Sequence, residues 1–490
     1  MKKEKRVHHK GFNAKAKCQR RSLGLPGLPA SSPDREHWDS APLEQLKAAT
    51  QYEVHQLGSL AGASHVVLHR GRCVFTCSEG YANRANGVLF GADTICALHG
   101  NTKPLVAAAF LTLVDEGRVK LDDPVSKHWP QFPKSVIVRG REQDLKAQPT
   151  FRNLLTMTSG LGYNEEEAYE GLMGRVKKRK VADLSTFCDE LAKTPLLFKP
   201  GARYEYGFST DVLGRMCEII SGKRLDKFVE ERLLKPLGMK DTHFVVPRAK
   251  LNRVSVLYDA GDPFPASKRR KTGLSYEIKQ YMNPDSAPGI MSAGGGILSY
   301  NDVGMYSTAQ DYARFCQMLL NDGVGVNKKR LLRASTVRSI WADGLAPFAR
   351  EDGRVAGWYN GGGPENVKYW DRVSWSLLGS HVTFDDQPQK GLERQGVAMF
   401  MGGGGGTYWA IDKRRKMVVA SFSNCFGGRK VCDGSDGHGP RANDAAPYAM
   451  AAADGAGHLL PHEYGLFGPP GCDPQKLRKQ LIVKLPVADE

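Results

Sequence analysis

Residues 104–116, PLVAAAFLTLVDE, are apolar almost all the way round a helical wheel. This pattern predicts a helix that is buried on every side rather than an amphipathic one. Pro104 suits the first turn of such a helix, and Gly117 suits the position where it ends. The chain therefore has a central helix, and Lys103 stands directly before its proline.

Two later segments predict amphipathic helices. Residues 210–221 and 309–322 each keep their apolar side chains on one face at helical spacing. Ser209 or Thr210 is the expected N-cap of the first of these helices, and Gly222 is its expected C-terminal end.

Strand patterns lie on both sides of these predicted helices along the chain. Residues 64–78, SHVVLHRGRCVFTCS, predict a β-hairpin, because two β-branched runs flank the turn residues HRGR. The segments TYWAID and KMVVASFSN predict two more strands joined by a turn. A hairpin, then helices, then a second hairpin indicates an α+β fold in which N- and C-terminal strands share one antiparallel sheet.

The domain organisation follows from composition. Residues 1–40 are basic and rich in Pro and Ser, and we expect a disordered tail. Residues 41–430 form the predicted domain, and 431–490 form a C-terminal extension. The irregular, polar segments within the domain are expected to be loop insertions: 162–185, 250–290 and 346–396. Five consecutive glycines at 402–406 lack a following Lys, so they predict close backbone approach rather than a phosphate-binding loop.

Charge and composition limit the cellular locations and the partners that we expect for this protein. The chain has 490 residues and a net charge of +17, and no apolar run reaches the length of a membrane span. Without the apolar core of a secretory signal, we expect a soluble, intracellular protein, most simply cytoplasmic, with organelle targeting left open. Residues 1–21 hold much of the positive charge. They are expected to be a solvated arm, and nucleic-acid or anionic-surface binding stays open.

The cysteines do not indicate a metal or a disulfide framework. The ten cysteines include no C-x-x-C pair, and we expect free, buried thiols in a reducing compartment. Cys73 and Cys77 lie too far apart on an extended strand to form a disulfide. No metal site and no organic cofactor are predicted.

Five motifs follow one another in order along the chain: DTICALHGNTKP, LLTMTSGL (154–161), the long segment KPGARYEYGFSTDVLGRMCEIISGKRLDKFVEERLLKPLGMKDTHF (199–244), SAGGGILS with STAQDYARFCQMLLNDG, and MGGGGGTYWAIDKRRKMVVASFSN. Together they resemble the motifs of the serine β-lactamase-related proteins, the family of class C β-lactamases, penicillin-binding proteins and related esterases. The resemblance covers roughly residues 45–430. It implies acyl transfer through a seryl ester, with a Ser and a Lys three residues apart on one helix face.

The resemblance implies roles for individual residues. Lys103 matches the family lysine, and Tyr206 matches the tyrosine that shares the proton transfer. Phe208 stands where many members have Asn, at a position expected to contact substrate. Met401, Gly402 and Gly403 stand where the family has His or Trp followed by Gly-Gly, so they are expected to contact substrate. Because Met401 is neither cationic nor aromatic, a β-lactam substrate is not expected.

Gly100 occupies the serine position, which is the decisive departure from the family pattern. Asn101 and Thr102 lie at other angles of the helix, and His99 is expected to point elsewhere. No S-x-x-K, T-x-x-K or C-x-x-K motif occurs anywhere in the chain. In a serine protease, loss of the nucleophile costs about 10⁶ in turnover, and a comparable loss is expected here.

Three functions remain open from the sequence. The first is a pseudoenzyme that keeps the fold as a module binding a small ester or amide ligand, or as a scaffold. The second is a hydrolase in which water replaces the serine and Lys103 and Tyr206 act as bases. The third is a nucleic-acid or anionic-surface binder that acts through the basic tail. Oligomeric state is not predicted.

Overall fold

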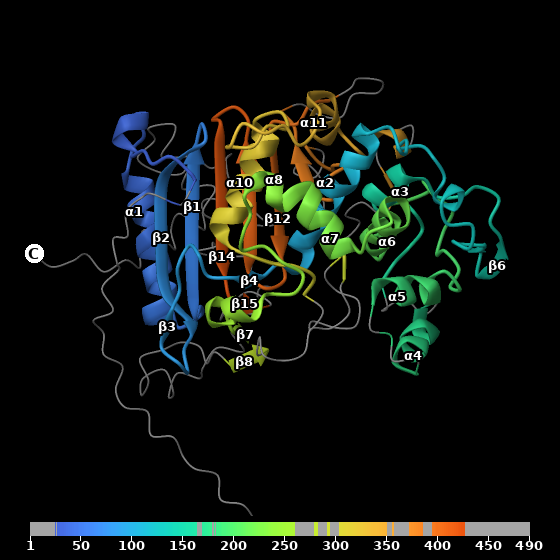
Figure 1. The fold of residues 1–490 in the computed structure, drawn as a ribbon, viewed down its shortest axis with the longest axis horizontal. Helices are drawn as coiled ribbons and strands as arrows, with labels where there is room; N and C mark the ends of the chain where they lie inside the picture. The colour runs from blue at the N-terminus through green and yellow to red at the C-terminus, as the bar shows by residue number, and fades with distance from the viewer. Residues whose placement is uncertain are drawn as a thin grey trace, which may run out of the picture.

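The computed structural model describes a three-layer arrangement centred on one antiparallel sheet (Figure 1). It describes residues 25, 27–163, 169–178, 181, 183–259, 279–282, 292–294, 303–349, 355–356, 372–385 and 394–426. The basic residues 1–21, the KRRK cluster at 268–271 and the expected extension 431–490 lie outside these residues. Of a second basic cluster in the sequence, KKRK at 177–180, only residues 177 and 178 are described.

The main sheet has eight strands. In spatial order they are β10 (Val373–Trp375), β11 (His381–Thr383), β12 (Ala398–Gly403), β13 (Thr407–Asp412), β14 (Met417–Ser423), β1 (Gly62–His69), β2 (Arg72–Asn83) and β3 (Val88–Leu89). Strand β1 pairs with both β2 and β14, so the two ends of the domain meet in the middle of the sheet, which confirms the predicted architecture. Arg70 and Gly71 both have positive φ in the β1–β2 turn, as a type I′ hairpin requires.

Smaller strand groups surround this sheet. They are β4 (Cys96–Ala97) with β9 (Tyr306–Ser307), β5 (Ser135–Val138) with β6 (Arg141–Asp144), and β15 (Cys425–Phe426) with β7 (Leu257–Asp259) and β8 (Lys279–Met282). The short β4–β9 pair lies next to the predicted active-site helix, because β4 ends two residues before that helix region begins.

The helices fall on both faces of the sheet and beside it. They are α1 (Ala41–Gln51), α2 (Thr102–Asp115), α3 (Phe151–Leu155), α4 (Glu170–Lys178), α5 (Leu184–Leu191), α6 (Ser209–Ser221), α7 (Leu225–Val229), α8 (Lys235–Leu237), α10 (Ala309–Leu320) and α11 (Ala334–Ile340). Single turns of 3₁₀-helix are η1 (Asp34–Glu36), η3 (His99–Asn101), η4 (Val125–Lys127), η7 (Arg248–Arg253) and η8 (Ala346–Phe348), and π-helical turns are η2 (Tyr52–Leu57) and η6 (Glu230–Leu234).

Alternation along the central strands creates two cores. On β1, Val66 and Leu68 join the large core shared with α2, α6 and α10, whereas Val67 joins a smaller core under α1. This period of two is what a strand buried on both faces requires. Helix α10 therefore covers one face of the sheet and α1 covers the other, while α3 to α7 form a helical region at one side (Figure 1).

Several sequence expectations need correction. Strands β10 and β11 belong to the main sheet although they fall within 346–396, which we expected to be a loop insertion. Helix α4 and the start of α5 fall within 162–185, another expected loop, and the apolar side chains of Leu172 and Val176 anchor α4 in the core. Strands β7 and β8 fall within 250–290.

Part of the expected tail is also ordered against the sheet. The backbone carbonyl of Cys73 on β2 accepts a hydrogen bond from the Ser31 N–H, and the backbone N–H of Cys73 donates one to the Pro29 carbonyl. The side chains of Leu28 and Trp38 are buried. The cysteines at 73 and 77 are free thiols, as expected. Helix α6 ends at left-handed Gly222, as predicted, but its N-cap is Phe208 without a side-chain cap, so the predicted Ser209 or Thr210 cap is wrong.

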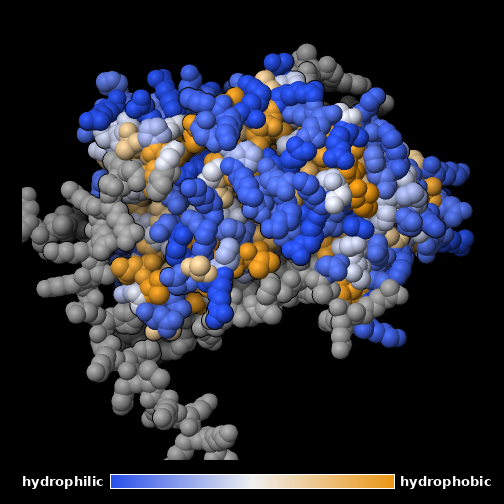
Figure 2. All heavy atoms as spheres, in the orientation of Figure 1, coloured by the Kyte–Doolittle hydropathy of each residue, from blue (hydrophilic) through white to orange (hydrophobic). Residues whose placement is uncertain are grey.

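The surface is mostly polar on the face drawn in Figure 2, with small, scattered hydrophobic patches. Among the described residues, the large hydrophobic side chains that are exposed are those of Val88, Leu89 and Val245. Within the same residues, no helix is long and apolar enough to cross a membrane, and no group of His, Cys, Asp and Glu could hold a metal ion.

Candidate active site

Gly100 lies in η3, directly before α2 begins at Thr102. The chain reaches this point from β4 and is held there by two backbone hydrogen bonds, from Leu98 to the Met305 carbonyl and from His99 to the Val303 carbonyl. His99 has a φ of 47°, an uncommon left-handed conformation for a residue with a side chain. The start of α2 is therefore fixed by backbone contacts that do not depend on the side chain at position 100.

Lys103 is buried in the first turn of α2, with 1% of its surface exposed. Its Nζ atom donates a hydrogen bond of 2.5 Å to the Gly294 carbonyl. The same atom lies 4.5 Å from the ring centre of Tyr206 and 5.9 Å from that of Tyr163. Burial alone lowers the pKa of Lys103, but the charges and hydrogen bonds of the two tyrosines outweigh burial, and the pKa is raised. Lys103 is therefore a charged ammonium at neutral pH.

A second buried charge stands behind the Gly294 peptide. Asp211 on α6 is fully buried, and its Oδ1 atom accepts hydrogen bonds of 2.9 Å from the Gly294 N–H and 2.9 Å from the Ser292 hydroxyl. Burial raises the pKa of Asp211, while the bond from Gly294 and the charge of Lys103 act in the opposite direction. One residue, Gly294, thus bridges the ammonium and the carboxyl group.

The space for a side chain at Gly100 is still present. A Cβ atom there would lie 3.2 Å from the Tyr206 hydroxyl oxygen, 3.5 Å from the Gly402 carbonyl oxygen and 3.5 Å from the Met401 methyl group. The shortest of these contacts is tight but requires a shift of only a few tenths of an ångström. The φ of Gly100 lies outside the left-handed region, so an L-residue would not be strained by the backbone.

Neighbouring side chains do not replace the missing serine. The Asn101 amide donates to Thr407 and accepts a 3.1 Å hydrogen bond from the Trp409 indole. The Thr102 hydroxyl accepts a 2.9 Å hydrogen bond from the Met305 backbone. Both are held away from Lys103, as expected.

The side chain of His99 packs beside Gly405. Its ring lies 2.9 Å from where a Cβ at Gly405 would be. Burial, helped by the charge of Lys103, lowers the pKa of His99 to about 4, so the ring is neutral at neutral pH.

The predicted substrate-contact residues divide into two groups. Met401 and Gly402 on β12 reach the Gly100 position, as their distances show. Gly403 packs its backbone against η3, since a Cβ there would lie 2.2 Å from the Leu98 carbonyl oxygen. Phe208 is fully buried, and its ring packs edge-on against Tyr163 at 5.0 Å, so it lies in the core behind the tyrosine and not at a surface that substrate could reach.

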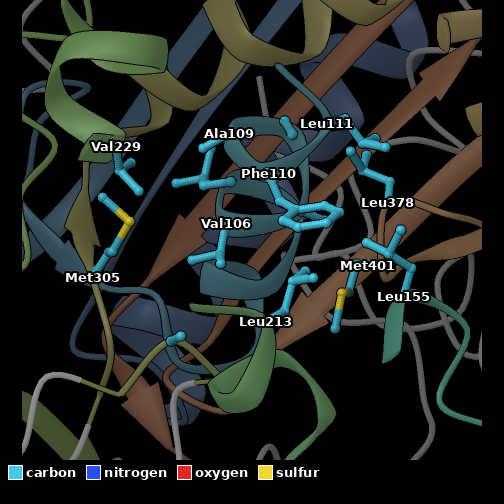
Figure 3. Packing of buried hydrophobic residues seen from close by; sticks show 14 of the residues in the cluster. Val106, Ala109, Phe110, Leu111, Leu155, Leu213, Val229, Met305, Leu378 and Met401 are labelled. Atoms are coloured by element: carbon cyan, nitrogen blue, oxygen red, sulfur yellow. The ribbon is translucent and has the colours of Figure 1, made fainter. Parts of the chain in front are cut away.

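The core packs tightly around α2, which fixes the lysine. Figure 3 shows Val106 and Phe110 of α2 between Met305 on one side and Leu378 and Met401 on the other. Because Met401 belongs to this cluster, the strand that faces Gly100 and the helix that carries Lys103 share one packed core. A packed core of this kind holds functional side chains in one geometry.

The family model described as Beta-lactamase matches residues 49–436. The chain belongs to the beta-lactamase family. Among curated relatives, it is 29% identical over 378 residues to Esterase EstB of Burkholderia gladioli, covering 74% of this chain and 86% of EstB. It is 26% identical over 349 residues to monacolin J acid methylbutanoyltransferase of Aspergillus terreus, covering 67% and 76%. The solved structure of EstCE1, a hydrolase with promiscuous acyltransferase activity, has a TM-score of 0.61 at 19% identity, covering 86% of this chain and 99% of EstCE1.

Two residues of this beta-lactamase-family site were missed from the sequence. Tyr163 lies two residues after the TSGL motif, at the start of a segment that we expected to be an insertion. Its position directly after a recognised motif was the available signal. Asp211 lies five residues after Tyr206 inside a predicted helix, and its link to Lys103 runs through Gly294, which the sequence does not place near either residue.

Proposed function

We propose that this chain binds an acyl compound, such as an ester, in the site that its family uses for acyl transfer, and that it forms no seryl ester. Gly100 carries this proposal, because it has no side chain to acylate and the adjacent Asn101 and Thr102 are engaged in other hydrogen bonds. The lysine, the tyrosine and the space between them support a retained binding site. The relatives with esterase and acyltransferase names support an acyl group as the ligand.

Hydrolysis by water is the second candidate. The Tyr206 hydroxyl lies next to the position of the missing Cβ, where a water molecule could be activated. This candidate needs a water molecule to take the place of the serine oxygen, and a loss of about 10⁶ in turnover on removal of a serine nucleophile argues against it. Binding without catalysis is therefore the function we favour.

The test compares the native protein with Gly100→Ser, using a p-nitrophenyl butyrate assay and a fluorophosphonate probe that labels active serines. We expect no specific labelling of the native protein, labelling of Gly100→Ser, and ester turnover up to about 10⁶-fold higher in that variant. Lys103→Ala in the Gly100→Ser background should abolish the gained turnover. Gly174→Ser, on an open face of α4, is the matched control and should stay unlabelled.

Two outcomes would overturn the proposal. Native ester turnover that is lost in Lys103→Ala would establish the hydrolase instead. Absence of labelling in a folded Gly100→Ser protein, with a melting temperature near that of the native chain, would mean that the site no longer accommodates an acyl group.

A further inference from the structure

Two hairpin turns bring basic side chains together at one end of the main sheet. The turns lie side by side, because the Arg70 N–H between β1 and β2 donates a 2.9 Å hydrogen bond to the Lys416 carbonyl between β13 and β14. Exposed Arg70 and Arg72 belong to the first hairpin, and exposed Arg414 and Lys416 belong to the second. In Figure 1 this end of the sheet is at the top of the view, where β14 begins.

Helix α11 ends beside the second turn and adds to its charge. The Nζ atom of Lys413, a half-buried residue of that turn, lies 4.8 Å from the ring centre of Trp341, where α11 ends. The last turn of α11 carries exposed Arg338. Burial lowers the pKa of Lys413, and the charges of Asp322 and Arg338 shift it in opposite directions. We define the basic end as six residues: Arg70, Arg72, Arg338, Lys413, Arg414 and Lys416.

Carboxylates at this end of the sheet leave most of these charges uncompensated. Three of them have partners of their own: Asp385 pairs with Arg414 at 3.0 Å, Asp412 with Arg415 at 2.6 Å, and Glu36 with His69 at 2.7 Å. Arg414 belongs to the basic end, whereas Arg415 and His69 do not. Within the described residues, the other five members of the basic end form no ion pair with a carboxylate. The surface therefore presents an excess of positive charge to solvent.

A strongly basic segment of the sequence joins the fold next to this end. The N–H of Cys73, the neighbour of Arg72, donates a 2.7 Å hydrogen bond to the Pro29 carbonyl, and Leu28 is buried in the main core. The residues that precede this point include nine Lys or Arg and one Glu at positions 1–21. Basic N-terminal segments are typical of nucleic-acid binders, and a surface of one sign attracts a partner of the other.

The side chains of the basic end suit the phosphates of a duplex. Four of the six are arginines, whose planar fork matches two oxygens of one phosphate. Among the described residues, the exposed large hydrophobic side chains are Val88, Leu89 and Val245, and none of them belongs to the two turns or to α11. Insertion into a bilayer uses apolar side chains, and binding of single strands uses aromatic stacking. A duplex held by its phosphates needs neither.

We propose that the basic end binds the phosphate backbone of a nucleic-acid duplex without reading its base sequence. This surface is separate from the acyl site. Thr407, at the start of β13, hydrogen-bonds Asn101 beside Gly100, whereas the basic end begins after Asp412, the last residue of β13. At about 3.4 Å per residue, the two ends of β13 are about 17 Å apart. The inference does not rest on the proposed function, and Gly100→Ser should bind a duplex as tightly as the native protein does.

Fluorescence anisotropy of the full chain with a labelled DNA duplex of about 20 base pairs tests the inference, in about 50 to 200 mM NaCl. Arg70→Gln/Arg72→Gln/Lys416→Gln should weaken binding at least about tenfold at about 100 mM NaCl. The slope of log affinity against log salt should become shallower by about 2.7, since each lost phosphate contact removes about 0.9. A second duplex of unrelated sequence should bind the native protein with the same affinity to within about threefold.

The matched control is Arg139→Gln/Arg141→Gln/Lys146→Gln. It also removes two arginines and one lysine, from exposed positions in and beside the hairpin of β5 and β6, and Arg139 has a positive φ as Arg70 does. Its affinity and its salt slope should equal those of the native protein. Melting temperatures near the native value establish that both triple variants are folded.

Four results would overturn the inference. Equal weakening in both triple variants would mean that binding follows net charge and not the basic end. Native affinity and slope in the basic-end variant would place the contacts in other basic segments. Absence of duplex binding at about 50 mM NaCl would remove the partner. Binding to phosphatidylserine vesicles that is lost in the basic-end variant, without duplex binding, would assign this surface to a membrane.

Discussion

Lys103 and Asp211 form a buried pair of opposite charges that one peptide unit separates, and this pair predicts a specific coupling in stability. Replacing Lys103 by Met keeps an unbranched side chain but leaves the Asp211 carboxyl group buried without its compensating charge. Replacing Asp211 by Asn keeps an acceptor oxygen for the Gly294 N–H but leaves the ammonium uncompensated. Breaking one side of a buried pair costs about 3–5 kcal/mol, so each single variant should lose about that much stability.

The size of the coupling follows from the geometry. Two hydrogen bonds and one residue connect the two charges. Lys103 Nζ donates to the Gly294 carbonyl at 2.5 Å, and the Gly294 N–H donates to Asp211 at 2.9 Å. Standard backbone dimensions then limit the separation of the charges to about 9 Å. At an effective dielectric constant of about 20, two unit charges at this distance attract each other by about 2 kcal/mol. The double variant should therefore be about 2 kcal/mol more stable than the sum of the single losses implies.

Urea unfolding of the native protein, both single variants and Lys103→Met/Asp211→Asn measures this coupling directly. The four free energies of unfolding form a double-mutant cycle. Additivity within about 0.5 kcal/mol would refute the reasoning, because it would mean that the Gly294 bridge transmits no electrostatic coupling. A cycle with Lys47→Met in place of Lys103→Met is the control, since Lys47 is half-buried on α1 and pairs with the exposed Glu44.

Two further predictions concern the fold around the site. His65 is fully buried, bonded to Thr50 at 3.0 Å and to Ser421 at 2.8 Å, and burial lowers its pKa from 6.5 to about 3. The neutral imidazole therefore stabilises the fold above pH 6.5, and this stability is lost as the pH falls from 6.5 towards 3, with about 2.7 kcal/mol lost at pH 4.5. Urea unfolding at pH 7 and at pH 4.5 measures the loss. It should disappear in His65→Gln and stay the same in His37→Asn, where the histidine is exposed. Gly207→Ala should lower the melting temperature, at a cost of roughly 1–3 kcal/mol, because a Cβ there would lie 2.5 Å from the Gly162 backbone. Gly174→Ala, in open space on α4, should raise stability by about 0.5–1 kcal/mol, and equal effects of the two substitutions would contradict the packing argument.

The parts of the fold that could be predicted are those whose pattern is local and long. Helix α2 and the hairpin of β1 and β2 carry unambiguous apolar patterns, and their predicted positions agree with the structure to within a few residues. The neighbouring motifs then placed Lys103 and Tyr206, which do lie together. Each of these features is encoded within about fifteen residues of sequence, where periodicity is informative.

The parts that could not be predicted depend on distant contacts. Strands β10 and β11 have three residues each, too few to show a period, and they are strands because they extend the edge of β12. The Asp211–Gly294 bond joins residues 83 positions apart. The α6 N-terminus has two good capping residues, but Ser209 hydrogen-bonds Ser159 instead, so tertiary packing overrode the local preference.

The arrangement around Gly100 explains how a chain can lack the serine and still keep the site. Backbone bonds hold the start of α2, and Gly294 links the charge of Lys103 to Asp211, so neither depends on the side chain at position 100. Lys103 therefore has a structural role that does not depend on catalysis, because removing it would leave the buried Asp211 carboxyl group without a compensating charge. A Cβ at position 100 would meet no backbone atom closer than 3.5 Å, and the Tyr206 hydroxyl at 3.2 Å would have to shift by a few tenths of an ångström. Stability thus constrains the lysine, while position 100 is open to changes that decide only the chemistry.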